Sequence, residues 1–343
     1  MKKGRILSLL LACMMILSLA ACGAQQEAEA PEAEGLPEMN LQLGTATSEE
    51  TSTHKGLMKF AELVSEKTDG KLTIDIYPNS QLGADRELLE ACQMGDVAMV
   101  GQTTAPQVNF IPTLAVFDMA STFPSREVAY EVFSGPFKDE IAKEYDAAGF
   151  KLVSIVPQDF RQTSSNKEIR SFEDFEGLKI RTMENPYHME YWRSIGTNPT
   201  PLAFSELYIA LQQGVVDAEE NMYETIYTNK LHEQQKYVVN TNHIMFLATV
   251  IMNKDIFEGL PEEYQTAITE SMAEADQYTY DLAGEKRDSF RKDLEDYGVE
   301  VIDLPEETHQ QMREAAKPAY DMIREAIGDD IVDKLLTAID EAS

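Results

Sequence analysis

Residues 57–78 read LMKFAELVSEKTDGKLTIDIYP, and this stretch decides the fold class. Its first half predicts a helix that ends at Asp69-Gly70, because its apolar residues share the spacing of one helix face: Leu57, Phe60, Ala61 and Val64. Its second half predicts a strand that ends at Pro78, because Leu72, Ile74 and Ile76 alternate with polar residues. A helix therefore passes directly into a strand.

The flanking segments extend this order in both directions. Residues 41–44 alternate like a short strand before the helix, and a short helix around Leu88, Leu89 and Cys92 precedes a strand at 97–100. The order β-α-β-α-β is typical of a mostly parallel sheet with helices on its faces. The first part of the chain is therefore predicted to be α/β.

The rest of the chain repeats this pattern over enough residues for about two globular lobes. We expect strands at 152–156, 178–181 and 244–252, and a further strand that begins at Val215. A helix is expected at 204–211. The run 244–252 is continuously apolar, as in a strand buried on both faces. A helix over 261–296 is long enough to lie across both lobes, and a strand at 299–304 with two more helices completes the chain.

The N-terminus has the features of a leader peptide. A basic segment, 1–5, precedes a largely apolar run of 16 residues, 6–21, which suits a signal sequence better than a membrane span. The run 19–23, LAACG, resembles the lipobox of bacterial lipoproteins, in which cleavage precedes a cysteine that is then lipidated, here Cys22. An ordinary signal peptide with a chance cysteine is the alternative. The acidic segment that follows, to Met39, is expected to be a flexible spacer.

The charge of the chain argues against several classes of partner. Lys2, Lys3 and Arg5 leave with the leader, so the net charge of −31 becomes −34. Phosphates of nucleic acids and anionic lipids would meet net repulsion, whereas a small anion responds more to a local pair of arginines. We therefore expect no nucleic-acid partner.

The sequence offers little support for an enzyme. It has no G-x-G-x-x-G, Walker A, H-E-x-x-H or G-x-S-x-G motif, and no cofactor or metal site is expected. Its five histidines are scattered, and we expect surface or capping roles for them: His54, His188, His232, His243 and His309. Cys92 is expected to be a buried free thiol on an apolar helix face.

Two arginines stand where a ligand site would form. Arg161 is expected to follow the strand 152–156 after a short loop, and Arg181 lies at the carboxyl end of its own strand. Ligands of open α/β sheets bind beyond the carboxyl ends of the strands, and paired guanidinium N–H groups match a carboxylate. From spacing alone, two surface arginines in ordinary ion pairs remain equally acceptable.

Several longer motifs carry a family resemblance. They are YPNSQLG at 77–83, GLKIR at 177–181, GTNPTP at 196–201, FSELY at 204–208, ALQQGVVD at 210–217, Glu220-Asn221, and Lys236-Tyr237 with Thr241-Asn242-His243. In this order and spacing, residues 41–327 resemble the DctP-type substrate-binding proteins of tripartite ATP-independent periplasmic (TRAP) transporters. The stretch 161–166, RQTSSN, leans toward members that bind sugar acids.

The resemblance implies an α/β fold of two lobes, like that of type II periplasmic binding proteins, with mixed sheets joined by crossing strands and a long helix. It implies lobes at 40–158 plus 247–285 and at 159–246 plus 286–343, after a signal peptide at 1–21 and a lipidated linker at 22–39. It also implies a ligand site in which Arg181 pairs with a carboxylate, shared with Arg161, Asn221, Glu220, Phe204, Gln102 and Thr47. Ala218-Glu219 and Met183 depart from the family pattern at the cleft wall.

The resulting expectation is a monomeric, lipid-anchored, extracytoplasmic binding protein. It would capture an organic acid, of the sugar-acid or C4-dicarboxylate class, and deliver it to a TRAP permease without a cofactor. A secreted enzyme on a similar scaffold and a ligand-sensing lipoprotein are the alternatives. Turnover of the acid would mark the enzyme, and neighbouring permease genes would argue against the sensor.

The lipobox leads to a first prediction. Cys22→Ser removes the thiol that would be lipidated, so we expect either soluble mature protein or an uncleaved precursor, with unchanged ligand binding by the purified domain. Fractionation and intact mass spectrometry measure both results. A correctly cleaved Cys22→Ser protein that stays on the membrane would contradict the lipobox interpretation.

Overall fold

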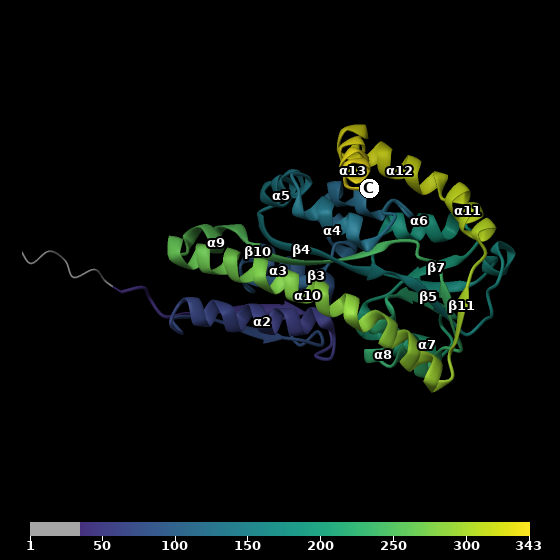
Figure 1. Ribbon diagram of the computed structural model, residues 1–343, viewed down its shortest axis with the longest axis horizontal. Coiled ribbons are helices and arrows are strands. Elements are labelled where there is room, and N and C mark those ends of the chain that lie inside the picture. Colours follow the sequence, from purple (N-terminus) through teal and green to yellow (C-terminus); the bar gives the residue numbers. More distant parts are fainter. Residues whose placement is uncertain (1–34) are drawn as a thin grey trace, which may run out of the picture. The chain divides into compact units, whose positions relative to one another are not determined.

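The computed structural model describes residues 35–343. The expected signal sequence at 1–21, Cys22 and most of the acidic spacer lie outside the described residues. The described chain forms two lobes built on two mixed sheets with many helices, which confirms the predicted α/β class (Figure 1). Within residues 35–343, we find no helix that is long and apolar enough to cross a membrane.

The first lobe contains a five-stranded sheet in the order β2-β1-β3-β10-β4. Strands β1, β2 and β3 are parallel, whereas β10 is antiparallel to both of its neighbours. The strands span Met39–Thr45 (β1), Leu72–Tyr77 (β2), Met99–Thr103 (β3), Phe150–Phe160 (β4) and Met245–Asn253 (β10). The helices here are α2 (Ser52–Lys67), α3 (Asp85–Met94), α4 (Arg126–Ser134), α5 (Phe137–Ala147) and α9 (Lys254–Gly259).

The second lobe contains a six-stranded sheet in the order β11-β9-β5-β8-β6-β7. The strands span Gln162–Ser165 (β5), Lys179–Thr182 (β6), Asn198–Pro201 (β7), Ala218–Asn221 (β8), Tyr237–Asn240 (β9) and Glu300–Asp303 (β11). Strand β8 begins later than expected, because the chain turns at Gly214 before the sheet resumes. The helices here are α6 (Pro186–Ser194), α7 (Phe204–Gln212) and α8 (Tyr223–Thr228).

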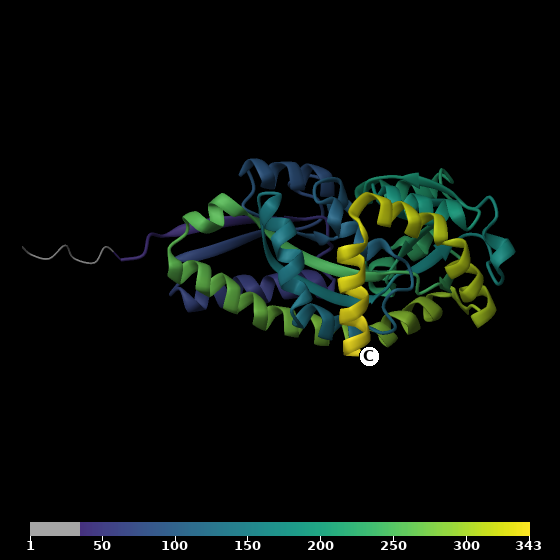
Figure 2. The same cartoon turned by 90° about the horizontal axis from the view of Figure 1, so that it is seen from above.

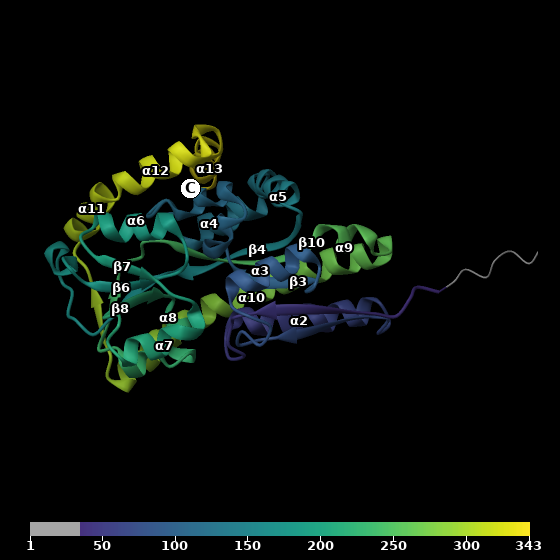
Figure 3. The ribbon, with the colours of Figure 1, turned by 180° about the vertical axis from the view of Figure 1, so that it is seen from behind.

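Three segments cross between the two sheets. Strand β4 passes into β5 through Arg161 alone, and β9 passes into β10 through residues 241–244. The backbone N–H of Arg161 donates to the carbonyl of Ile244 at 2.8 Å, so the two crossings are joined. Helix α10 (Glu262–Tyr297) is the third, and its later turns pack beside α8 (Figure 3). The short loop expected before Arg161 does not exist, because β4 extends to Phe160.

The apolar residues of β10 and the helix residue Cys92 lie in the core, as predicted. Strand β10 is buried at nearly every position on both faces, as its continuous apolar run requires. Cys92 is a free, fully buried thiol, and burial raises its pKa to about 12.

The C-terminal segment differs from the expected division. It holds three helices rather than two: α11 (Glu306–Ala315), α12 (Lys317–Ile327) and α13 (Asp329–Ala342). Helix α11 packs on the second lobe, but Val332 and Leu335 of α13 join the apolar core of the first lobe (Figure 2). Residues 286–343 therefore do not all belong to the second lobe, because the apolar face of α13 is buried against α4 and its neighbours.

Gly56 permits close packing of two helices in the first lobe. A Cβ added to Gly56 of α2 would lie 1.9 Å from Oγ1 and 3.1 Å from Cβ of Thr279 in α10. The hydroxyl of Thr279 is itself bound to the carbonyl of Ala275 at 2.7 Å. Helices α2 and α10 can therefore pack this closely only while position 56 carries no side chain.

We therefore predict that Gly56→Val destabilises the first lobe. The added side chain forces α2 from α10, and overpacking of this kind costs about 1–3 kcal/mol of unfolding free energy. Thermal and denaturant unfolding measure the change. Gly259→Val is the matched control, because a Cβ at Gly259 meets open space. Equal stability of the two variants would contradict the packing argument.

Candidate ligand-binding site

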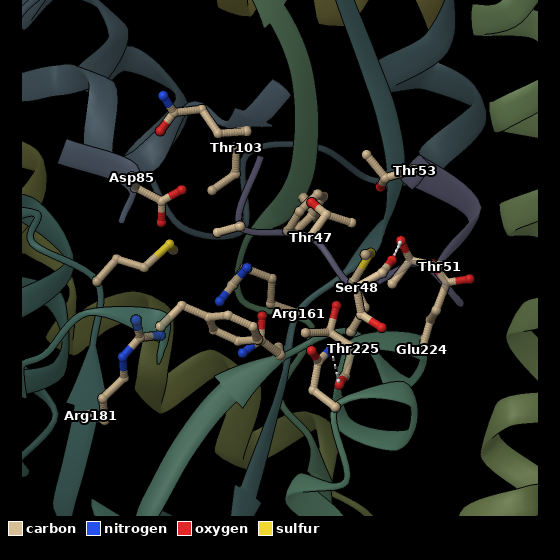
Figure 4. A pocket seen from close by; sticks show the side chains of 18 residues that line it. Thr47, Ser48, Thr51, Thr53, Asp85, Thr103, Arg161, Arg181, Glu224 and Thr225 are labelled. Atoms are coloured by element: carbon tan, nitrogen blue, oxygen red, sulfur yellow. Dashed lines mark hydrogen bonds between the residues drawn. The ribbon is translucent and has the colours of Figure 1, made fainter. Parts of the chain in front are cut away.

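A cavity lies between the lobes and holds about 580 Å³ of unfilled space, part of it open to solvent. Six of the seven residues expected to bind ligand line it: Arg161, Arg181, Asn221, Phe204, Gln102 and Thr47. Thr47 and Gln102 come from the first lobe, and the other four come from the second or from the crossing between them. Figure 4 shows Arg161 between Arg181 and Asp85 on one side and Glu224 on the other.

Arg161 is fixed from behind. Its guanidinium is 2% exposed and pairs with both carboxylate oxygens of Glu220, one of them at 3.0 Å from Nη2, and with the backbone carbonyl of Glu220. Its Cζ lies 5.5 Å from the ring centre of Phe246. The remaining nitrogen, Nη1, is buried and has no hydrogen-bond partner. One end of the guanidinium is therefore anchored, and the other is left for a ligand.

Arg181 is fixed in a similar way from β6. Its Nε and Nη2 donate to the carbonyl of Leu202 at 2.9 and 2.7 Å, and Nη1 is buried without a partner. Burial lowers the pKa of Arg181, and the charges of Glu220 and Glu219 oppose that shift. Phe204 lies beside the guanidinium, at 5.9 Å from ring centre to Cζ. Both arginines thus present one unpartnered nitrogen each.

Gln102 adds two more unpartnered atoms from the first lobe. It lies on β3, it is 5% exposed, and neither its amide oxygen nor its amide nitrogen has a partner. Thr47 lies in the loop after β1 and is half-buried at the cavity wall. The first lobe therefore offers a donor and an acceptor opposite the arginines.

Glu220 is the one expected site residue that does not line the cavity. Its side chain is fully buried behind Arg161 and also meets Nε2 of His243 at 3.1 Å. Burial alone would raise the pKa of Glu220, but Arg161 and His243 outweigh burial and hold the pKa below its usual range. Glu220 therefore neutralises and orients Arg161 instead of facing a ligand.

The expected surface or capping roles are wrong for four histidines: His54, His188, His232 and His243 are all buried. His188 meets Asp118 at 2.8 Å, and His243 stacks on Tyr191 at 5.7 Å while it also meets Thr241. These side chains are held by packing and hydrogen bonds. Within residues 35–343, no group of three His, Cys, Asp or Glu side chains is placed to hold a metal ion.

Two acidic residues of the cavity were missed by the sequence analysis. Asp85 begins α3, and burial at the cavity wall raises its pKa to about 6 although Arg181 opposes the shift. Glu224 on α8 is 7% exposed, and burial raises its pKa against the effect of its hydrogen bonds to Ser52. Nothing in their sequence context separates these two from the many other carboxylates of the chain.

Hydrogen bonds at the cavity wall and away from it join the two lobes. The backbone N–H and the hydroxyl of Ser52 on α2 both donate to Oε1 of Glu224, at 2.8 and 2.7 Å. The amide of Asn109 donates to the backbone carbonyl of Glu184 at 2.7 Å. The lobes therefore meet around the cavity through a buried carboxylate that caps a helix of the opposite lobe.

Comparison of the amino-acid sequence with known proteins finds bacterial solute-binding proteins. The profile of the bacterial extracellular solute-binding proteins, family 7, matches residues 43–326. The chain is 32% identical over 281 residues to the C4-dicarboxylate-binding periplasmic protein DctP of Rhodobacter capsulatus, covering 81% of this chain and 84% of that protein. It is 28% identical to the 2,3-diketo-L-gulonate-binding periplasmic protein YiaO of Escherichia coli, covering 78% of this chain and 82% of that protein.

Comparison of the fold with solved structures finds proteins of the same kind. The sugar acid binding protein of Advenella mimigardefordensis in complex with galactonate superposes with a TM-score of 0.87 at 27% identity, covering 90% of this chain and 100% of that chain. A TRAP periplasmic solute binding protein of Desulfovibrio salexigens with bound orotic acid gives a TM-score of 0.86 at 30% identity, covering 89% and 99%.

The contact between Ser52 and Glu224 leads to a prediction about closure. Glu224→Ala leaves the buried Ser52 N–H without its acceptor, which costs about 1–3 kcal/mol in the form where the lobes meet. We expect a larger radius of gyration without ligand and a lower unfolding free energy. Small-angle scattering and denaturant unfolding measure these effects.

Glu224→Gln is the matched control, because its amide oxygen can still accept from Ser52. We expect this variant to keep the compact form. Identical scattering of the Ala variant and the native chain would show that this contact does not hold the lobes together.

Proposed function

The chain belongs to family 7 of the bacterial extracellular solute-binding proteins, and from this premise we propose that it captures an organic acid between its lobes for a TRAP membrane permease. Membership confirms the family resemblance noted in the sequence. The family comprises solute-binding proteins rather than enzymes, so the proposal involves binding and release without covalent chemistry or a cofactor.

The observation that supports this proposal most strongly is a set of four unpartnered polar atoms around one cavity. They are Nη1 of Arg161, Nη1 of Arg181, and both amide atoms of Gln102. A buried polar group without a partner costs about 1–3 kcal/mol, so a ligand that completes these hydrogen bonds recovers this cost when it binds. A carboxylate that accepts from both guanidinium groups would satisfy the arginines, and a neighbouring ligand hydroxyl would satisfy Gln102.

The other polar groups of the cavity favour a hydroxylated acid. Asp85 and Glu224 line the cavity, where their carboxylates could accept hydrogen bonds from ligand hydroxyls but would repel a second ligand carboxylate. Thr51, Thr103 and Asn229 add neutral polar groups to the wall. We therefore place the ligand among the sugar acids, the class to which the galactonate of the Advenella protein belongs, in preference to the C4-dicarboxylates.

Closure would follow from the position of the ligand between the lobes. Gln102 and Thr47 on one lobe and the arginines on the other can contact the same small molecule only when the lobes are together. We further propose a monomer that is anchored outside the cytoplasmic membrane through lipidated Cys22, with lobes divided near Arg161 and Ile244. Neither the enzyme nor the sensor alternative has a specific observation in its favour.

We predict that Arg181→Ala weakens binding of the acid by about 2–5 kcal/mol, because the ligand carboxylate and the buried site lose a paired charge. Arg181→Lys should also bind weakly, since an ammonium group cannot donate to Leu202 and the ligand as a planar fork does. Calorimetry with galactonate, L-gulonate, D-erythronate and succinate measures both effects.

Arg193→Ala is the control, because Arg193 is exposed and pairs with Glu190 on the surface. We expect native affinity from it, and galactonate, L-gulonate or D-erythronate should bind the native chain more tightly than succinate. The proposal fails if none of the four acids binds the native chain, or if Arg181→Ala retains native affinity.

A further inference from the structure

Glu219 lies beside the ligand cavity without lining it. Its carboxyl is fully buried on β8, where one oxygen accepts from the side-chain amide of Asn221 at 2.6 Å and the other contacts the hydroxyl of Ser164. Ser164 is the residue opposite Glu219 in the antiparallel pairing of β5 and β8. Glu219 thus connects Asn221, which lines the cavity, to the neighbouring strand.

The buried charges around Glu219 leave no net positive charge to compensate an anionic ligand. Arg161, Arg181, Glu219 and Glu220 are each at most 2% exposed. If both acids were ionised, two positive and two negative charges would cancel, and a ligand carboxylate would enter as an uncompensated buried charge. Such a charge is strongly unfavourable in a site shielded from water. One neutral carboxyl among these four leaves two guanidinium groups facing one carboxylate of the buried set and one of the ligand. Asp85 and Glu224 of the cavity wall add further negative charge, so they increase the need for a proton.

We propose that Glu219 is a positioning residue that fixes Asn221 toward the ligand and binds the proton which allows the ligand carboxylate to enter. This inference rests on the proposed function, since it requires an organic acid at Arg161 and Arg181. It makes ligand binding a proton-coupled event.

The surroundings assign the proton to Glu219 rather than to its neighbours. Glu220 on the same strand is bound to Arg161 and His243, which favour its ionised form. Glu219 contacts only the neutral groups of Ser164 and Asn221, and burial raises its pKa to about 7, against the pull of Arg161. Arg181 on β6 is the other cation that acts on it. His243 lies beyond Glu220, and burial lowers its pKa, so it is neutral near pH 7.

The direction of the pH effect follows from these charges. An anionic ligand raises the pKa of Glu219 further, so binding above about pH 7 must take up a proton. The affinity therefore falls as the pH rises through the pKa of the ligand-free form, by at most about tenfold per pH unit. Below that pKa the proton is already present, and the affinity is independent of this group.

A glutamine at position 219 reproduces the protonated form. A protonated Glu219 donates to the Ser164 hydroxyl and still accepts from Asn221, and a glutamine amide makes the same two contacts. Glu219→Gln should therefore retain the fold and the position of Asn221 but bind no proton. Glu219→Ala removes both contacts, so it tests the positioning role separately.

The experiment is titration calorimetry at about pH 6 and pH 8, in buffers of different ionisation enthalpy. The probe is whichever of galactonate, L-gulonate, D-erythronate and succinate binds the native chain most tightly. For the native chain we expect uptake of nearly one proton at pH 8, little at pH 6, and about tenfold weaker binding at pH 8. Glu219→Gln should lose this uptake and this decrease. Asp85 and Glu224 are present in both proteins, so the difference between the two isolates Glu219.

Two further variants separate positioning from titration. Glu219→Ala should bind more weakly than the native chain at both pH values, because Asn221 is no longer held. Ser164→Ala is the matched control, because it removes the hydroxyl contact but leaves the contact with Asn221, so its affinity at pH 6 should stay near native.

The outcomes distinguish this inference from the function on which it rests. If an acid binds the native chain but Glu219→Gln takes up the same number of protons, the proton resides elsewhere and the inference is overturned, while the proposed function stands. Native affinity in Glu219→Ala at both pH values would overturn the positioning role. If no acid of the panel binds the native chain at either pH, the proposed function itself fails.

Discussion

The buried ion pair between Arg161 and Glu220 is the interaction on which the rest of the structure depends. A guanidinium removed from water is tolerated only when its charge and its hydrogens are met by protein groups. Glu220 meets them from β8, His243 holds Glu220 from the second crossing, and the Ile244 carbonyl holds the backbone of Arg161. One pair therefore ties together both strand crossings and the wall of the cavity. The same pair leaves one nitrogen of Arg161 free, so the interaction that stabilises the junction also prepares the site.

Much of the fold was predictable because a buried face of a helix or strand requires apolar residues at a regular spacing in the sequence. The alternation of apolar residues in β2, their helical spacing in α2 and the continuous apolar run of β10 each match the faces that the structure buries. The position of α13 was not predictable on this basis. Its apolar face shows that the helix is buried on one side, but the pattern carries no information about which lobe supplies the partner. Two helices were expected after β11 and three are present. Pro318 in the first turn of α12 and Gly328 before α13 are the sequence signals of the two breaks.

The site was predictable to the extent that motifs marked it. Arg161, Arg181 and Asn221 came from short motifs with a definite order, and the structure brings all three to one cavity, although their ligand contacts remain proposals. Glu220 belonged to the same motif, yet its side chain points away from the cavity because neighbouring residues of a strand face opposite sides. Asp85 and Glu224 could not be distinguished among 60 acidic residues, since their place at the cavity depends on elements far apart in the sequence. The charge-rich composition thus concealed two acids that line the cavity.

The single residue between β4 and β5 has a consequence for how such a chain can change during evolution. Side chains alternate along a strand, so an insertion or deletion of one residue at Arg161 would turn every side chain of β5 to the opposite face. Thr163 and Ser164 would exchange environments, and the arginine would leave its carboxylate partner. Length variation can accumulate in the surface turns of both lobes, whereas this junction does not tolerate a change in residue count. The number of residues at this junction therefore fixes which side chains of β5 face the ligand site.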